Sequence, residues 1–167
     1  MSNLQATTII LVEDDLGHAR LIEKNLRRAK ITNKIIQLHD GQQALDYLFG
    51  QREQARPPLS RFLMLLDLNL PVLNGMQVLQ RIKNDSRTKR IPVVILSTTD
   101  DPREVEACYE LGCNLYITKP VEYAKFSQTI RQLGQVLSVV TLPATVGRVG
   151  AIPCGCPTNT PTNQHTN

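Results

Sequence analysis

The sequence has 167 residues, 41% of them hydrophobic, which suits one ordinary domain with a buried core or one domain followed by a tail. Its formal net charge is +4 at pH 7, and no run of five or more Lys and Arg occurs, so nothing indicates nucleic-acid binding electrostatically. The sequence contains no apolar stretch of about 18 residues, the length that a membrane-spanning helix needs. Without a signal-peptide pattern near Met1, we expect a cytoplasmic protein whose four cysteines are free thiols.

Short apolar runs alternate with amphipathic stretches along the chain, and the two kinds predict buried strands and helices respectively. Starting with a strand, the alternating segments are Thr7–Val12, Leu16–Lys30, Lys34–Leu38, Gly41–Phe49, Phe62–Leu66, Gly75–Lys83, Ile91–Leu96, Pro102–Leu111, Leu115–Ile117 and Val121–Val140. Five strands alternating with five helices predict βαβ units, and therefore a parallel sheet covered by helices on both faces.

Two segments fall outside this alternation. Residues 51–61 form a polar stretch with a Pro-Pro pair, which is long for a loop. Residues 143–167 are rich in Pro, Thr and Asn and contain a single charged residue, Arg148, so we expect a disordered tail. The predicted organisation is one folded domain over residues 1–142 and a tail over residues 143–167.

Polar side chains follow four of the predicted strands at the point where each strand ends. These residues are Glu13 and Asp14, Asp67 and Asn69, Ser97, and Lys119. Because parallel strands end at one edge of the sheet, where such folds bind ligands, we expect these side chains to converge. Neighbouring carboxylates repel one another unless a cation intervenes, and oxygen ligands with room for water suit Mg²⁺.

The same set of residue types suits phosphoryl transfer. An aspartate such as Asp67 can act as a nucleophile that forms an acyl phosphate. A divalent ion and Lys119 would neutralise charge around the phosphoryl group, and the Ser97 hydroxyl would donate a hydrogen bond to one of its oxygens. Phosphoryl transfer depends mainly on such positioning and neutralisation.

The segments LVEDD, LLDLNLPVLNG, VVILST and LYITKP, in this order over about residues 7–140, resemble the receiver domain of two-component response regulators. The resemblance implies a flavodoxin-like (βα)5 fold, an α/β architecture with a doubly wound parallel sheet in strand order 2-1-3-4-5. It also implies a phospho-accepting signalling protein rather than an enzyme, which receives its phosphoryl group from a histidine kinase.

By the same resemblance, Asp67 is the phospho-acceptor in a Mg²⁺-dependent step. Asp14 corresponds to the direct metal ligand and Glu13 to an acidic partner that acts largely through water. Asn69 stands where the main-chain carbonyl of the family binds the metal, and Lys119 matches the conserved lysine.

The resemblance also implies a switch and a partner surface. Ser97 matches the conserved hydroxyl residue, and Tyr116 matches the aromatic residue that turns inward when that hydroxyl engages phosphate. Pro120 follows Lys119 in a peptide bond that is cis in the family. The surface around His18 and Leu21, with the loop at Pro120, corresponds to the one that docks the histidine helix of the kinase.

A narrower resemblance points to the small response regulators of cyanobacterial phytochromes. It is carried by the long polar stretch before Phe62–Leu66, the LSTT and YITK sequences, and a last helix that continues into VTLPA. It implies that the partner is a light-sensing, phytochrome-like histidine kinase.

Apolar residues recur at intervals of three and four along the last predicted helix. The stripe consists of Tyr123, Phe126, Ile130, Leu133, Leu137 and Val140. In one interpretation the whole stripe packs in the core. In the other, Leu133, Leu137 and Val140 extend past the sheet and pair with a second copy, which gives a homodimer through the fourth helix, fifth strand and last helix.

Three alternatives remain at this point. A Mg²⁺-dependent aspartyl-phosphate phosphatase of another α/β family usually requires a second carboxylate two residues after the nucleophile, where this chain has Asn69. A transcription factor requires an effector domain, which about 25 tail residues do not hold. A pseudo-receiver that acts without phosphate is disfavoured because every chemical position of the family is filled.

Overall fold

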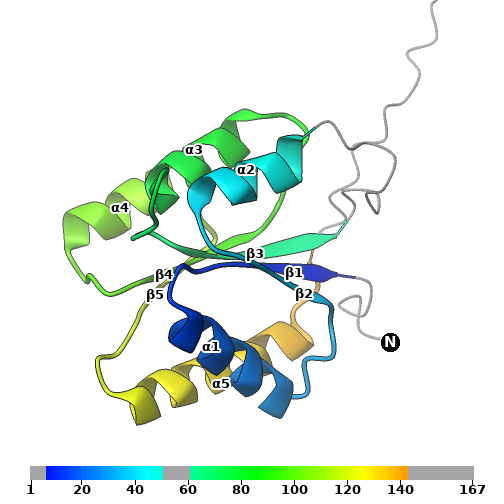
Figure 1. The fold of residues 1–167 in the computed structure, drawn as a ribbon, viewed down its shortest axis with the longest axis vertical. Coiled ribbons are helices and arrows are strands. Elements are labelled where there is room, and N and C mark those ends of the chain that lie inside the picture. The colour runs from blue at the N-terminus through cyan, green and yellow to red at the C-terminus, as the bar shows by residue number, and fades with distance from the viewer. Residues whose placement is uncertain (1–6, 51–60, 143–167) are drawn as a thin grey trace, which may run out of the picture.

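The computed structural model describes residues 7–50 and 61–142, so the predicted tail and nearly all of the polar stretch lie outside the described residues. The elements in chain order are β1 (Thr8–Val12), α1 (Leu16–Arg28), β2 (Ile35–Leu38), α2 (Gly41–Phe49), β3 (Phe62–Asp67), α3 (Gly75–Asn84), β4 (Val93–Ser97), α4 (Pro102–Glu110), β5 (Leu115–Thr118) and α5 (Tyr123–Val139). The strands form one parallel sheet in the order β2-β1-β3-β4-β5, with α1 and α5 on one face and α2, α3 and α4 on the other (Figure 1). The predicted flavodoxin-like fold is confirmed.

The central strands are apolar on both sides because helices cover both faces of the sheet. All six residues of β3 are buried, and β1 lies between β2 and β3. Alternate residues of β1 enter different cores: Ile10 and Val12 pack toward α2 and α3, whereas Ile9 and Leu11 pack toward α1 and α5. This double burial fixes the register of the strands, and so it fixes which residues emerge at their carboxyl ends.

Side-chain caps start the first four helices. The carboxylates of Asp15, Asp40 and Asp101 accept hydrogen bonds from main-chain N–H groups at the starts of α1, α2 and α4. Asn74 and Gln77 form a reciprocal capping box at the start of α3. Asp15 therefore has a structural role next to the acidic pair that precedes it, and Asp101, not Ser97, caps α4.

Every element except α2 differs from the prediction by one or two residues at an end, and the three largest differences are at β4, α1 and α5. Strand β4 begins at Val93 rather than Ile91 because Pro92 has no N–H to donate to the sheet. Helix α1 ends at Arg28, before Lys30, whose φ of 66° is left-handed. Helix α5 begins at Tyr123, and Val121 before it is fully exposed to solvent.

The α1–α5 layer overturns two predictions about exposure. Leu133 and Leu137 do not extend past the sheet: each is 4% exposed, packed in a core with Leu26 of α1. Gly134 allows this close approach, because a Cβ there would lie 2.6 Å from the Cβ of Ala29. Leu21, predicted to face a partner, is likewise buried in this core.

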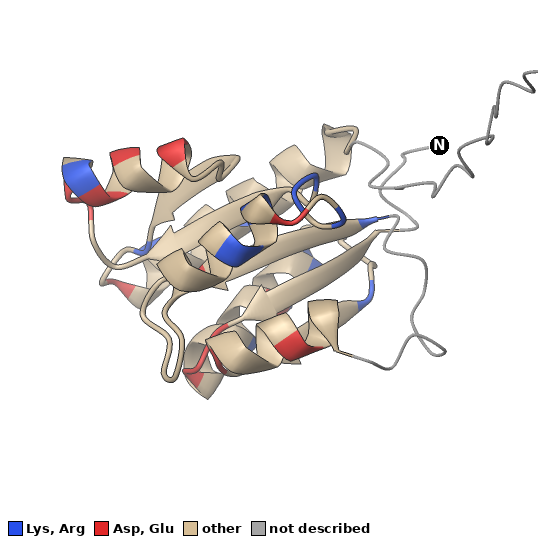
Figure 2. Cartoon of the chain, turned by 90° about the horizontal axis from the view of Figure 1, so that it is seen from above, with Lys and Arg blue, Asp and Glu red and all other residues tan. Residues whose placement is uncertain are grey.

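The edge of the sheet formed by β5, together with α4, is less buried than the α1–α5 layer. Cys108 is the one buried residue of α4, and β5 is partly exposed along its length. Acidic residues mark α4 in Figure 2, where Glu106 and Glu110 are exposed and Glu104 is half-buried. Cys108 and Cys113 are free thiols, as predicted, whereas Cys154 and Cys156 lie outside the described residues.

Candidate functional site

The carboxyl ends of β1, β3, β4 and β5 bring together the residues that the sequence predicted to converge. We call Glu13, Asp14, Asp67, Ser97 and Lys119 the strand-end site. Ligand oxygens of its three carboxylates lie within 4.8 Å of one another. Glu13 and Asp67 are buried, and Asp14 is exposed, so the cluster opens to solvent on the Asp14 side.

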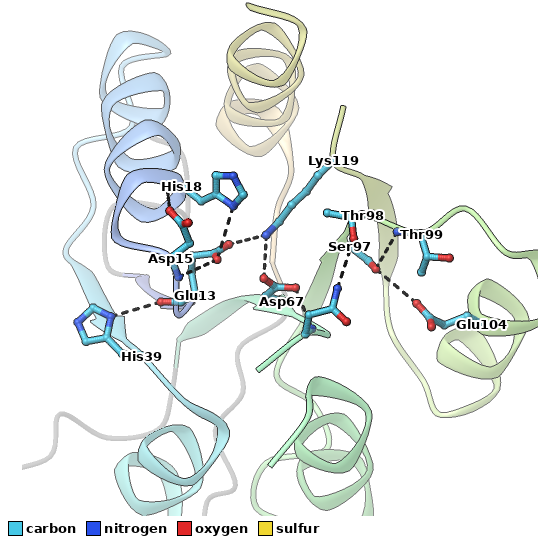
Figure 3. A network of polar contacts seen from close by, with 11 residues as sticks. Glu13, Asp15, His18, His39, Asp67, Ser97, Thr98, Thr99, Glu104 and Lys119 are labelled. Atoms are coloured by element: carbon cyan, nitrogen blue, oxygen red, sulfur yellow. Dashed lines mark hydrogen bonds and ion pairs between the residues drawn. The ribbon is translucent and has the colours of Figure 1, made fainter. Parts of the chain in front are cut away.

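Lys119 is the cation at the centre of the strand-end site (Figure 3). Although it is only 4% exposed, its Nζ donates hydrogen bonds to Glu13 Oε2 at 2.5 Å and to Asp67 Oδ2 at 2.8 Å. Burial raises the pKa of the Glu13 carboxyl, and the ammonium of Lys119 partly offsets that effect. The cluster therefore holds three carboxylates and one ammonium group, which pairs with Glu13 and Asp67. This leaves a surplus of negative charge.

The surplus of negative charge favours a metal cation at the strand-end site. The donor atoms at hand are carboxylate oxygens, the ligand type that Mg²⁺ and Mn²⁺ accept readily. The exposed Asp14 leaves the approach open to water, which Mg²⁺ retains in its coordination shell. The residues present thus fit a hard divalent cation.

The loop after Asp67 holds this aspartate in place. The main-chain N–H of Asn69 donates to Asp67 Oδ1 at 3.0 Å, which places Asn69 beside the cluster as predicted. Gly75 lies so close to the loop that a Cβ there would be 2.2 Å from the carbonyl oxygen of Asp67. Val72, exposed at the tip, has a left-handed φ of 68°, which is rare for a β-branched residue.

The predicted switch residues share one acceptor. The hydroxyl of Tyr116 lies 2.9 Å from the carbonyl oxygen of Thr99 and 3.2 Å from Glu104 Oε1, and these two acceptors share its one proton, so Tyr116 is turned inward. The fully buried Ser97 donates its Oγ proton to the same Glu104 oxygen at 3.4 Å. Burial, with a smaller contribution from the Glu104 charge, raises the pKa of Tyr116 to about 12.

Sequence reasoning missed Glu104. It lies seven residues after Ser97, in the first turn of α4, where an acidic residue is expected simply to favour the helix dipole. The sequence holds no signal that its carboxylate turns toward Ser97 and Tyr116, because that contact depends on how α4 packs beside β4 and β5.

The peptide bond before Pro120 is trans, so the predicted cis form is wrong for this structure. The two forms of a bond before proline differ by only about 0.5–1 kcal/mol, so local packing decides between them. On the trans backbone, the N–H of Lys119 donates to the carbonyl oxygen of Ser97 at 2.6 Å, and its side chain still reaches the carboxylates.

Two of the three residues predicted to face a partner are accessible. His18 and Pro120 are half-buried, whereas Leu21 is buried. His18 Nδ1 lies 3.8 Å from Glu13 Oε1, and its ring packs edge-on against Phe126. His18 therefore borders the strand-end site directly, as Figure 3 shows.

Comparisons with known proteins identify the family of this chain. The sequence profile of the response regulator receiver domain matches residues 9–131. Response regulator Rcp1 of Synechocystis sp. is 39% identical over 137 residues, which cover 81% of this chain and 92% of Rcp1. The structure of Mn²⁺-bound Rcp1 has a TM-score of 0.75 and 38% identity, covering 83% of this chain and 99% of that one.

Two further solved structures are similar. A response regulator receiver domain from Rhodospirillum rubrum is 55% identical with a TM-score of 0.79, and the match covers 84% of this chain and all of that one. The phosphorylated cyanobacterial phytochrome response regulator RcpA is 37% identical with a TM-score of 0.73, covering 83% of this chain and 99% of RcpA. Both resemblances inferred from the sequence, to receiver domains and to phytochrome response regulators, are confirmed.

Proposed function

Because the chain belongs to the response regulator receiver family of two-component signalling, we propose that Asp67 accepts a phosphoryl group from a histidine kinase. The observation that carries this proposal is the setting of Asp67. It is a buried aspartate beside two further carboxylates, and a buried lysine donates to its oxygen at 2.8 Å. Such a cluster suits a nucleophile that must meet an anionic phosphoryl group.

The proposed step transfers one phosphoryl group between two side chains. A carboxylate oxygen of Asp67 forms a bond to phosphorus as the bond from phosphorus to the kinase imidazole nitrogen breaks. The imidazole leaves with that electron pair and takes up a proton from solvent. Lys119 supplies positive charge beside the new acyl phosphate, and the N–H of Asn69 orients the carboxylate before attack.

A divalent cation completes the proposed chemistry. Glu13, Asp14 and Asp67 would hold it, and the main-chain carbonyl of Asn69 is the further ligand that the family resemblance implies. When bound, Mg²⁺ neutralises charge on the carboxylates and on the phosphoryl oxygens. The existence of a Mn²⁺-bound form of the similar Rcp1 supports divalent-cation binding by this chain.

Signalling would follow from the switch residues. Ser97 would leave Glu104 and donate to a phosphoryl oxygen on Asp67, which would reshape the surface of α4, β5 and α5, while Tyr116 is already turned inward before phosphorylation. The similarity to Rcp1 and RcpA favours a phytochrome-like kinase as the donor, docked near His18 and Pro120. No helix in residues 7–50 and 61–142 is long and apolar enough to span a bilayer, and a cytoplasmic location stays a prediction.

Homodimerisation also stays a prediction, with Val140 of the predicted surface exposed and Leu133 and Leu137 buried. The apolar residues exposed at the end of α5 are Val136, Val139 and Val140. They are the surface on which a second copy would pair. Light scattering at micromolar concentration is expected to give twice the monomer mass, and a monomeric mass would contradict the dimer.

Phosphotransfer between purified proteins tests the proposed function. Phosphorylated phytochrome-type kinase and an unrelated phosphorylated histidine kinase are each mixed with wild type and with Asp67→Asn. We expect rapid labelling of wild type by the phytochrome-type kinase, with Mg²⁺ and not with a chelator. Labelled Asp67→Asn would refute the assigned acceptor. Turnover of a phosphomonoester by wild type would instead favour the phosphatase alternative.

A further inference from the structure

Glu104 stands out among the described residues because its carboxylate serves two switch residues at once. Oε1 of Glu104 accepts a hydrogen bond from Ser97 Oγ at 3.4 Å and one from the Tyr116 hydroxyl at 3.2 Å. The other acidic residues of α4, Glu106 and Glu110, are exposed, whereas Glu104 is half-buried and its carboxylate contacts Ser97 of β4 and Tyr116 of β5.

The contact with Ser97 sets up a competition. A serine hydroxyl has one proton to donate. In Figure 3 the Ser97 hydroxyl is directed toward Glu104 and Thr99, and the N–H of Thr99 donates to its oxygen at 3.3 Å. A phosphoryl group on Asp67 that accepted the Ser97 proton would have to take it from Glu104.

The contact with Tyr116 holds the second switch residue inward without phosphate. Glu104 and the carbonyl of Thr99 share the one proton of the Tyr116 hydroxyl, and both acceptors lie in or just before α4. Glu104 is the carboxylate that contacts this hydroxyl, and the uncharged side chains of Ser97 and Cys108 also act on it. Glu104 thus ties β4, β5 and α4 together through one carboxylate.

From this geometry we infer that Glu104 is a positioning residue that restrains phosphorylation: it withholds the Ser97 hydroxyl from Asp67 while keeping Tyr116 inward. The inference rests on the proposed function of Asp67 and deepens its regulation. Hydrogen bonds to a charged carboxylate are roughly twice as strong as those to a neutral acceptor. Loss of the Glu104 charge should therefore release Ser97 in part.

The test compares Glu104→Gln with Glu106→Gln, an exposed neutral substitution on the same helix. Each variant is phosphorylated with a small acyl phosphate and Mg²⁺, and the donor concentration that phosphorylates half of the chain is measured. We expect Glu104→Gln to lower this concentration about three- to tenfold, because one long charge-assisted hydrogen bond is weakened. Glu106→Gln should match wild type.

A second background separates a positioning role from a general charge effect. If Glu104 acts through Ser97, Glu104→Gln should have no further effect in a Ser97→Ala background. The half-saturating donor concentrations of Ser97→Ala and of the double variant should then be about equal, a ratio of about one. The same gain in both backgrounds would overturn the inference. Equal labelling of Glu104→Gln and wild type would also overturn it, while the proposed function would stand.

The third measurement needs no phosphate. Carbon-13 labelled tyrosine, assigned with Tyr116→Phe, reports the Tyr116 ring by NMR in the unphosphorylated chain. We expect its signal to shift in Glu104→Gln and to stay in place in Glu106→Gln. An unmoved signal would overturn the inference. If no variant takes up phosphate at all, the proposed function fails, and the restraint on phosphorylation fails with it.

Discussion

The α1–α5 layer buries apolar side chains in close contact, whereas the strand-end site buries carboxylates around one ammonium group. In the layer, Leu133 and Leu137 pack against Leu26, and a glycine lets the two helices approach. In the site, Glu13 and Asp67 are buried beside Lys119. Burial of apolar area stabilises a fold, and burial of charge costs free energy unless pairing compensates it. Apolar burial in the α1–α5 layer therefore offsets the free-energy cost of burying charge at the strand-end site.

The largest expected effect is in the layer. Leu133→Ala would leave a cavity between α1 and α5 and lower the free energy of unfolding by about 2–5 kcal/mol. Leu115→Ala, in the partly exposed β5, should cost only about 1 kcal/mol because less area is buried. Urea denaturation measures the free energy of unfolding of both variants. Equal losses of stability would contradict the expected difference between the layer and β5.

Gly134→Ala tests the closeness of the two helices. Alanine favours a helix over glycine by about 1 kcal/mol, but a Cβ here would lie 2.6 Å from Ala29 Cβ. We expect the clash to dominate and a net loss of about 1–2 kcal/mol on unfolding. Gln135→Ala, exposed on the next position, is the control and should change stability little. A more stable Gly134→Ala would show that the layer is loosely packed.

At the strand-end site, removal of charge should have the opposite sign. Asp67→Asn lowers the number of carboxylates in the cluster from three to two, so mutual repulsion falls. We expect a gain of about 1 kcal/mol in the free energy of unfolding without divalent cations, at the expense of function. The gain should shrink when Mg²⁺ stabilises wild type by binding. A loss of stability without Mg²⁺ would mean that the site does not destabilise the fold.

The smallest expected effect is at the loop tip beside the site. Val72 has a φ of 68°, a conformation that costs most L-residues about 1–2 kcal/mol and asparagine less. Val72→Asn should therefore raise the free energy of unfolding by about 0.5–1 kcal/mol. Val139→Asn, another exposed valine but in α5, is the control without this strain. Equal changes in the free energy of unfolding of the two variants would show that the backbone at Val72 is not strained.

The comparison also explains what the sequence could predict. Strand ends converge in any parallel sheet, so the placement of Glu13, Asp67 and Lys119 followed from the alternation of elements alone. The helix Gly41–Phe49 was predicted to the residue from its amphipathic pattern, and in the structure Asp40 caps its start and Gly50 follows its end.

Contacts between helices were harder to predict. The spacing of Leu133 and Leu137 does not distinguish a helix of the same chain from one of a second copy, and α1 turned out to be the partner. Leu21 lies on the flank of its helix, and its burial depends on how that helix packs. Glu104 was missed for the same reason: its role exists only once α4 lies beside β4 and β5.

The central claim is that the buried carboxylate at the end of β3 takes the phosphoryl group. Intact-mass measurement with an acyl phosphate, followed by peptide mapping, tests it without any kinase. We predict one added phosphoryl group per chain, located on Asp67, in the presence of Mg²⁺ and absent after chelation. Phosphate on another residue, or labelling of Asp67 that ignores the chelator, would contradict the account.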